Sequence, residues 1–312
     1  MNKVSRLILA IALIVTTMAA MVGCSGASGG QTEKKTEITI SSKDFTENML
    51  LGKMLIKYLE YNGYPVKDET GLGASGLIRT ALESGEIDSY WEYTGTALMG
   101  FMKHEPSFDA EESYNLVKKW DEENNDIIWL DYAPVNNTYC IVTTKDVMEK
   151  YNIKTISDMA NCIKKGETLR FISNPEYFER ADGMPQVENA YGFELPEKDR
   201  ILLDLGLFYT ALTNKEGELT VGFTTDGMIA ASGFEILNDD KNAFPVYNAT
   251  PVFRKEIIEA YPELPELVNK LSALINNETM MQLNAAVDVE EKNIDEVAEN
   301  FLIEKGLIKK DK

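Results

Sequence analysis

Short apolar runs alternate with longer amphipathic segments along most of the chain after residue 37. Short runs bounded by polar or turn residues are typical of strands, and apolar positions that recur every three or four residues are typical of helices. Strands are therefore predicted over 38–41, 66–69, 87–90, 127–130, 139–143, 169–172, 220–223 and 235–237. Helices are predicted over 47–61, 77–84, 95–101, 111–123, 156–164, a stretch that begins at Pro175, 227–231, and the whole of 252–307.

The alternation of strands and helices runs to about residue 130 and restarts near residue 139. Alternation of this kind is typical of α/β layers, in which helices cover a sheet. Two such blocks followed by a helical end predict an α/β protein with two lobes. The length of 312 residues is sufficient for two modest lobes after a leader is set aside.

The N-terminus has the pattern of an export signal. Lys3 and Arg6 precede an uncharged, mostly apolar run that ends just before Cys24. The pattern predicts a lipoprotein signal peptide over 1–23, and Cys24, in a context that resembles a bacterial lipobox, is the predicted site of lipidation. A plain signal peptide followed by a chance cysteine is the alternative. The polar stretch rich in Gly and Ser that follows predicts a flexible tether over 24–36.

The chain is strongly acidic, with a formal net charge of −20. This charge argues against nucleic acid or a broad anionic membrane surface as a partner. The body has no second long apolar run, so no membrane span is predicted there. His104 is the only histidine, which excludes His-based metal cages and histidine-dependent triads. No G-x-S-x-G motif occurs, and no metal, cofactor or catalytic residue is predicted.

The segment 71–76 reads GLGASG and fits the G-x-G-x-x-G pattern of a dinucleotide-binding turn. It lies between a predicted strand and a predicted helix, and the acidic Asp88 follows. The motif is short, glycines serve many tight turns, and an exported protein meets little NAD. An ordinary turn that leads into a helix is therefore favoured over an NAD site.

Two cysteines, Cys140 and Cys162, lie in the body of the chain. An oxidising compartment permits a disulfide between them, whereas two small buried thiols are the simpler interpretation. The second interpretation is favoured because nothing in the sequence brings the two residues together.

Several short motifs occur together in a fixed order. They read SKDFTE at 42–47, GLG at 71–73, GEID at 85–88, WEYTGT at 91–96, NTY at 137–139, EYFER at 176–180, TDG at 225–227 and FPVY at 244–247. In this combination the chain resembles the substrate-binding proteins of osmoprotectant importers, which serve ATP-driven uptake of glycine betaine, choline, carnitine and related quaternary amines. The resemblance implies a two-lobed, periplasmic-binding-protein-like (type II) fold with a ligand cleft, in which 37–135 plus 245–312 form lobe 1 and 136–244 form lobe 2.

The resemblance also implies an aromatic cage. A trimethylammonium group has a diffuse positive charge and no N–H donor, so aromatic faces suit it better than ordinary hydrogen bonds do. The positions that match the family's cage are Tyr93, Tyr139, Phe223 and Tyr247. Phe223 departs from the family's usual tyrosine, and loss of the hydroxyl is expected to weaken binding, widen the pocket or shift the substrate preference. An ordinary place in the core is the alternative for each ring, above all for Phe223.

Polar contacts to the ligand are implied in the same way. Lys43 and Arg180 are the candidates for a ligand carboxylate, which arginine grips with two parallel N–H bonds. Thr96 offers its hydroxyl, and Asn137, an aspartate in some relatives, helps to order the site. Glu176 lies four residues before Arg180 and holds it for the ligand, although an ordinary i,i+4 ion pair explains the same spacing. A solvated surface position is the alternative for Lys43.

In this family the GLGASG stretch is a turn that leads into a helix of the first lobe. Ser75 and the neighbouring N–H groups then lie at the helix N-terminus, where the dipole favours an anion. The turn is therefore expected to face the cleft and to assist the ligand carboxylate or lobe closure.

The resemblance finally implies a monomeric, lipid-anchored extracytoplasmic receptor without chemistry of its own. Such a receptor delivers its ligand to a permease that a separate ATPase powers, and this chain has no G-x-x-x-x-G-K-[ST] motif. The alternatives are the same fold with a different small amine or amino acid as ligand, a sensory co-receptor, and an exported hydrolase with Glu86 and Asp88 as acid and base.

Overall fold

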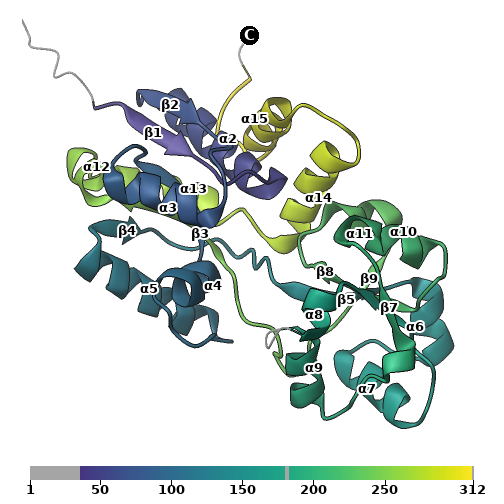
Figure 1. Cartoon of the computed structure of the whole chain (residues 1–312). Coiled ribbons are helices and arrows are strands. Elements are labelled where there is room, and N and C mark those ends of the chain that lie inside the picture. The colour runs from purple at the N-terminus through teal and green to yellow at the C-terminus, as the bar shows by residue number, and fades with distance from the viewer. Residues whose placement is uncertain (1–35, 180–182, 311–312) are drawn as a thin grey trace, which may run out of the picture. The chain divides into compact units, whose positions relative to one another are not determined.

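Two five-stranded sheets organise the chain in the computed structural model, which describes residues 36–179 and 183–310 (Figure 1). The first sheet has the strand order β2-β1-β3-β10-β4, and the second has the order β7-β6-β8-β5-β9. The strands of the first sheet are β1 (Ile38–Ser41), β2 (Val66–Glu69), β3 (Ser89–Tyr93), β4 (Ile127–Trp129) and β10 (Ala249–Arg254). Those of the second sheet are β5 (Tyr139–Thr143), β6 (Phe171–Ser173), β7 (Arg200–Leu202), β8 (Leu219–Phe223) and β9 (Glu235–Leu237).

Helices connect the strands in both halves. The helices before β5 are α2 (Thr46–Tyr61), α3 (Ser75–Ser84), α4 (Thr94–Thr96), the π-helix η2 (Ala97–Phe101) and α5 (Ala110–Asn124). Those between β5 and β10 are α6 (Lys145–Tyr151), α7 (Ile156–Lys164), α8 (Pro175–Glu179), α9 (Met184–Tyr191), η3 (Glu197–Asp199), η4 (Leu205–Leu207), α10 (Phe208–Thr213) and α11 (Gly227–Ser232). The last helices are α12 (Lys255–Ala260), α13 (Leu264–Ser272), α14 (Asn277–Asp288) and α15 (Ile294–Glu304). Within the described ranges, none of the helices combines the length and apolar character required to cross a bilayer.

The first sheet has apolar side chains packed against both of its faces. Successive residues of a strand point to opposite faces, and the central strands β3 and β10 follow this rule. Tyr90 and Val252 pack into a cluster with residues of α3 and α5. Trp91 and Phe253 belong to another cluster, which includes residues of α2 and α15. Full burial of a side chain such as Phe253 stabilises the fold by about 1.5–3 kcal/mol.

The chain crosses from the first sheet to the second after β4 and returns before β10. The two crossing segments are joined by an antiparallel bridge between Asn136 and Asn248. The Tyr247 N–H donates to Asn136 Oδ1 at 2.7 Å, and the Asn137 N–H donates to the Tyr247 carbonyl at 3.1 Å. This pairing fixes Asn137 and Tyr247 next to each other, although they lie far apart in the sequence.

The prediction of a wholly helical segment over 252–307 is wrong at its start. The strand β10 occupies Ala249–Arg254 and lies between β3 and β4 in the first sheet. A proline has no N–H to donate, so Pro251 argues against a central strand. In the structure Pro251 lies opposite Trp91 of β3, and its carbonyl accepts the Leu130 N–H at 3.1 Å. The helical prediction is confirmed only after β10, where α12 to α15 follow.

The other differences are smaller. The strand predicted over 87–90 is shifted to β3, and the helix predicted over 95–101 is the short α4 followed by the π-helix η2. The elements β7, α6 and α10 were not predicted. The short helices η3 and η4 had no predicted counterpart either, and the helical stretch predicted from Pro175 was given no end. The other strands and helices agree with their predicted ranges to within a few residues, and the prediction of two α/β blocks is confirmed by the two sheets.

Gly85 ends α3 in the left-handed conformation, with φ 77°, as expected for a helix stop. A Cβ atom at this position would lie 2.6 Å from Arg254 Nη1, and Arg254 is held by Asp88 at 3.3 Å and Glu256 at 2.8 Å. Gly85→Ala is therefore expected to lower the free energy of unfolding by about 1–2 kcal/mol from backbone strain and by roughly 0.5 kcal/mol more from the displaced ion pairs. Urea denaturation of the wild type and the variant measures the sum of these two losses in the free energy of unfolding.

Gly63→Ala is the matched control. Gly63 has a similar φ of 81°, but a Cβ atom there would meet nothing within 4 Å. Its variant should show only the loss from backbone strain. Equal losses for the two alanine variants would contradict a contribution from Arg254.

Candidate functional site

A cavity of about 250 Å³ contains most of the predicted ligand residues. The residues that line it are Lys43, Phe45, Ser75, Tyr93, Thr96, Asn137, Thr138, Tyr139, Phe223 and Tyr247. All the predicted cage aromatics are among them, as are the predicted polar residues Lys43, Thr96 and Asn137. The lining comes from the first sheet, from the second sheet and from both crossing segments, so residues distant in the sequence meet at one place.

Three predicted residues are not placed by the structure. Glu176 belongs to α8, but its side chain lies outside the described part, and Arg180 and Cys24 lie outside the described residues. Their predicted roles stay predictions.

The second sheet supplies a stacked pair of rings. Tyr139 of β5 and Phe223 of β8 are directly opposite each other in the antiparallel pairing. Their ring centroids are 5.1 Å apart and the planes are inclined by 27°, because cross-strand partners on one face lie within contact distance. Tyr177 of α8 meets Tyr139 edge-on at 5.5 Å.

The other rings are positioned by the first sheet and by the returning segment. Tyr93 ends β3 and stacks against Phe45 with centroids 6.1 Å apart. A Cβ atom on Gly95 would lie 2.7 Å from Tyr247 Cδ1, so a glycine at this position lets the Tyr247 ring approach the backbone of α4. Phe45, which is 40 % exposed, was not predicted as a site residue.

Lys43 lies in the interior of the protein, and the alternative of a solvated surface side chain is wrong. The residue is 4 % exposed, its Nζ lies 2.5 Å from Glu92 Oε1, and it lies 5.0 Å from the centroid of the Tyr93 ring. Glu92 is fully buried and also accepts the Tyr90 hydroxyl at 2.7 Å. An ammonium group has three donors, so Lys43 keeps the capacity to donate to a ligand beside its bond to Glu92.

Glu47 is a buried residue next to the lining of the cavity that the sequence analysis did not single out. It is 3 % exposed, and Glu47 Oε1 accepts the Tyr93 hydroxyl at 2.8 Å and Asn137 Nδ2 at 3.0 Å. Its other oxygen, Oε2, accepts Asn284 Nδ2 from α14 at 3.2 Å, and the Thr225 side chain is a further partner. Burial raises the pKa of Glu47 although these hydrogen bonds lower it.

A signal for Glu47 was present in the helix pattern. The buried residues Leu50 and Leu51 follow Glu47 three and four residues later in α2. This spacing puts the acid on the buried face of the helix. An acid in the first turn of a helix is also favoured by the helix dipole, so its position in α2 does not by itself indicate burial. Burial also raises the pKa of Tyr93, so its hydroxyl keeps the proton that it donates to Glu47.

The GLGASG stretch forms a turn that is attached to the Lys43 segment. Gly71 and Gly73 have positive φ angles of 83° and 147°. The Gly71 N–H donates to Ser42 Oγ at 2.8 Å, and the Leu72 N–H donates to the Ser42 carbonyl at 3.0 Å. Ser75 opens α3 and lines the cavity. The expected turn into a helix is confirmed, and a contact between Ser75 and a ligand stays a prediction.

Asp88, which the hydrolase alternative used as an acid or base, has structural partners. Asp88 Oδ2 accepts the Thr39 N–H of β1 at 2.8 Å, and Asp88 Oδ1 lies 3.3 Å from Arg254 Nη1 of β10. Burial raises the pKa of Asp88. The residue does not line the aromatic cavity, and its bonds hold neighbouring strands together.

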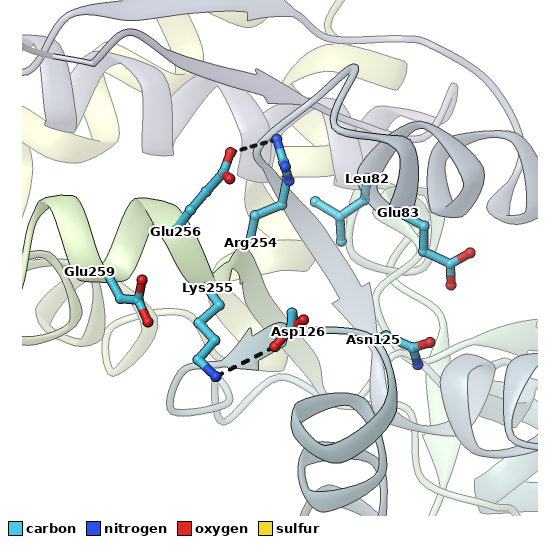
Figure 2. A pocket seen from close by; sticks show the side chains of 8 residues that line it. All are labelled: Leu82, Glu83, Asn125, Asp126, Arg254, Lys255, Glu256 and Glu259. Atoms are coloured by element: carbon cyan, nitrogen blue, oxygen red, sulfur yellow. Dashed lines mark hydrogen bonds and ion pairs between the residues drawn. The ribbon is translucent and has the colours of Figure 1, made fainter.

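A larger cavity of about 450 Å³ lies at the ends of α3 and α5 beside the start of α12. Figure 2 shows its two bases already paired, Arg254 with Glu256 at 2.8 Å and Lys255 with Asp126 at 3.4 Å. It has no aromatic wall. Because the described residues that line it offer no π-face, its chemistry does not match a quaternary amine.

The described residues hold no group of three or more His, Cys, Asp or Glu side chains arranged for a metal ion. Cys140 is buried and Cys162 is half-buried, and both are free thiols. The favoured interpretation of two buried, unpaired thiols is therefore confirmed for Cys140, whereas Cys162 is unpaired but only half-buried.

Comparisons with known proteins agree on one family. The family model described as "Substrate binding domain of ABC-type glycine betaine transport system" matches residues 36–304. A "Glycine-betaine-binding protein" of Pseudomonas aeruginosa is 35% identical over 92% of this chain and 94% of its own. An "Ergothioneine transport permease/ergothioneine binding protein EgtU" of Helicobacter pylori is 34% identical over 86% of this chain and 48% of its own. The solved structure of apo YehZ from Escherichia coli has a TM-score of 0.80 at 34% identity and covers 87% of this chain and 99% of that one.

Replacement of Glu47 is expected to destabilise the protein strongly. Glu47→Ala leaves several buried donors without an acceptor and should lower the free energy of unfolding by roughly 2–4 kcal/mol. Glu60→Ala, at an exposed position of the same helix, is the control and should change it by less than about 0.5 kcal/mol. Similar losses in denaturant titrations of the two variants would contradict the assigned contacts.

Glu47 also predicts a pH dependence. Its pKa is raised above the ordinary value of 4.5, so above this pH the native state retains a proton that the unfolded chain has lost. The free energy of unfolding then falls as pH rises towards the native pKa. Relative to Glu47→Gln, the wild type should lose stability over the pH window that opens above 4.5. A constant difference between the two proteins across this window would contradict the raised pKa.

Loss of one partner of the buried Lys43–Glu92 pair is expected to destabilise the protein more than replacement of both partners does. Lys43→Met leaves Glu92 charged and buried, so the free energy of unfolding should fall by about 3–5 kcal/mol. Lys43→Met combined with Glu92→Gln should recover at least about half of this loss. Lys67→Met, which breaks the exposed Lys67–Glu69 pair, should cost less than about 1 kcal/mol. No recovery in the double variant would show that Lys43 stabilises the fold by other contacts.

Proposed function

The chain belongs to the family of substrate-binding domains of ABC-type glycine betaine transport systems, and from this premise we propose that it captures a quaternary ammonium osmoprotectant in the 250 Å³ cavity. Glycine betaine, choline and carnitine are the proposed ligands. Members of this family are transport binding proteins and not enzymes, so the hydrolase alternative is wrong.

One observation carries the proposal: Tyr93, Tyr139, Phe223 and Tyr247 line the same cavity as Lys43. Aromatic faces attract a methylated cation through their quadrupoles and cover its methyl groups. A desolvated contact of this kind contributes about 2 kcal/mol, and several of them are sufficient for micromolar affinity, which corresponds to about 8 kcal/mol.

The polar side chains of the cavity suit the other end of such a ligand. Lys43 donates to a carboxylate, and Thr96 donates its hydroxyl. Asn137 Oδ1 is buried and accepts no hydrogen bond from the described residues, so it is an acceptor for the hydroxyl of choline. Arg180, held by Glu176, is proposed to complete the carboxylate contacts.

The proposed cellular arrangement follows from the N-terminus and the family. Residues 1–23 act as a signal peptide, lipidation of Cys24 anchors the mature chain outside the cell membrane, and 24–36 form the tether. A ligand that contacts both lobes (37–135 plus 245–312, and 136–244) stabilises their closed state. The closed monomer then delivers the ligand to a permease driven by a separate ATPase.

A ring-bearing betaine is a second candidate ligand. One relative is named for ergothioneine, a betaine that carries a heteroaromatic ring. In this chain a further aromatic cavity borders the proposed cage and shares Tyr139 and Phe223 with it, which favours room for such a ring.

Calorimetric titration of the chain from residue 25 tests the proposal. Glycine betaine, choline or carnitine should bind with micromolar affinity, and proline, which has no trimethylammonium group, should not bind. Tyr247→Leu and Tyr139→Leu keep apolar bulk but remove the π-face, so each should weaken binding about 30-fold, equivalent to ~2 kcal/mol.

Tyr61→Leu is the control for these variants, because Tyr61 is 47 % exposed and does not line the cavity. It should leave the affinity unchanged. Full affinity in the Tyr247→Leu and Tyr139→Leu variants would reject the aromatic cage, and the absence of any quaternary-amine binding by the wild type would reject the proposed substrate class.

A further inference from the structure

A buried carboxylate behind the proposed cage is bonded to two residues that line it. Glu47 Oε1 accepts the Tyr93 hydroxyl at 2.8 Å and Asn137 Nδ2 at 3.0 Å. Both partners line the 250 Å³ cavity, whereas Glu47 does not. A charge on Glu47 therefore acts on the content of the cavity through these two groups and not by direct contact.

The partners of Glu47 suit its ionised form. An ionised carboxylate only accepts hydrogen bonds and has about four sites for them. Besides the two cavity residues, Asn284 Nδ2 donates to Oε2 at 3.2 Å, and the Thr225 side chain is a further partner. A protonated Glu47 would have to donate a hydrogen bond, and the amide nitrogens of Asn137 and Asn284 cannot accept one.

The bond from the Tyr93 hydroxyl affects the Tyr93 ring. A hydrogen bond to an ionised acceptor is stronger than one between neutral groups, and it draws the hydroxyl proton towards the carboxylate. The phenol oxygen is conjugated with the ring, so the negative charge that this polarisation leaves on the oxygen also enriches the π-face. Because a cation is attracted by the negative charge of that face, an ionised Glu47 makes Tyr93 a better partner for an ammonium group.

The bond from Asn137 acts in the same sense. A carboxylate accepts from the nitrogen of an amide and not from its oxygen, so Glu47 sets the orientation of the Asn137 amide. Asn137 Oδ1, the negative end of the amide dipole, is buried and has no hydrogen-bond partner among the described residues. Both groups that Glu47 holds are thus polarised in the sense that favours a cation in the cavity.

Other charged side chains lie beside Glu47 and its partners, namely Lys43, Asp44, Glu92, Asp226 and Asp288. Lys43 and Glu92 are paired with each other at 2.5 Å. Burial raises the pKa of Asp226 as it does that of Glu47. A pH effect on binding therefore has to be assigned with a variant of Glu47 itself.

We propose that Glu47 is a positioning residue for the cation: in its ionised form it polarises Tyr93 and Asn137, so that the cage prefers a permanent positive charge. The inference rests on the proposed function, since the cation is that of a quaternary amine in the cage. The ionised form of Glu47 favours the cation, and by linkage the bound cation favours the ionised form. Ligand affinity and the ionisation of Glu47 are therefore coupled.

Calorimetric titrations at a series of pH values test this coupling. The positive charge of a quaternary amine does not titrate, and the carboxyl groups of glycine betaine and carnitine are ionised above about pH 4. For whichever of glycine betaine, choline and carnitine binds, the wild-type affinity is expected to rise about 10-fold over the pH window that opens above 4.5 and then to reach a plateau.

Glu47→Gln keeps the size of the side chain and removes its charge. Its affinity should be constant across this window and about 10-fold below the wild-type plateau. Glu60→Gln removes a charge from an exposed position of the same helix and should keep both the wild-type affinity and its pH dependence. Tyr93→Phe keeps the ring but loses the hydroxyl, so its affinity should be lower than that of the wild type and rise less with pH. Thermal melts at each pH establish which variants are folded.

The possible results distinguish the role of Glu47 from the proposed function. If a quaternary amine binds with an affinity that is constant above pH 4.5, the role of Glu47 is overturned and the proposed function stands. The same holds if Glu47→Gln keeps the wild-type pH dependence, which then belongs to another group such as Asp226. If Glu47→Gln does not fold, equal pH profiles of Tyr93→Phe and the wild type overturn the inference. If no quaternary amine binds at any pH, the proposed function fails and the inference fails with it.

Discussion

The site depends on one buried carboxylate. Glu47 accepts hydrogen bonds from Tyr93 of β3, from Asn137 of the first crossing segment and from Asn284 of α14. These bonds fix the hydroxyl of Tyr93, a proposed cage ring, and the amide of Asn137, a proposed ligand contact. Burial of a carboxylate is unfavourable unless its oxygens are satisfied, so the surrounding donors have little freedom to move. The rigidity that a ligand site requires is thus provided by a residue that does not line the cavity.

The paired crossing segments provide the second constraint. Asn136 uses its side chain to hold Tyr247 and its carbonyl to accept the Thr224 hydroxyl of the second half. Asn277 of α14 donates to the same carbonyl at 2.9 Å. The segment that carries Asn137 and Tyr139 is therefore tied to elements on both sides. These bonds connect α14 to the crossing segments, so α14 is more than a cover for the core.

The sequence could predict what depends on local pattern and on motif. The alternation of strands and helices, the helix stop at Gly85 and the aromatic residues of one cavity all follow from such signals. The strand β10 could not be predicted locally, because Pro251 is unfavourable in a central strand and is accepted only through its neighbours β3 and β4. The pairing of Lys43 with Glu92 and the hydrogen bonds of Glu47 join residues that are 49 and 46 or more positions apart. Such contacts depend on tertiary structure, so they cannot be predicted from the periodicity or the charge spacing of a single helix or strand.

The charge balance of the cavity bears on how it would select a ligand. Lys43 is paired with Glu92 at 2.5 Å, and none of the described residues that line the cavity is an acid that would attract a cation by formal charge. Attraction of a quaternary amine then has to come from aromatic quadrupoles, which act at short range and require close contact with the methyl groups. The −20 net charge of the chain attracts cations of every kind from a distance, but it does not distinguish a trimethylammonium group from an ordinary one. In the proposed cage, selectivity therefore depends on the shape of the aromatic surface, and Phe223 is the one proposed cage ring without a hydroxyl.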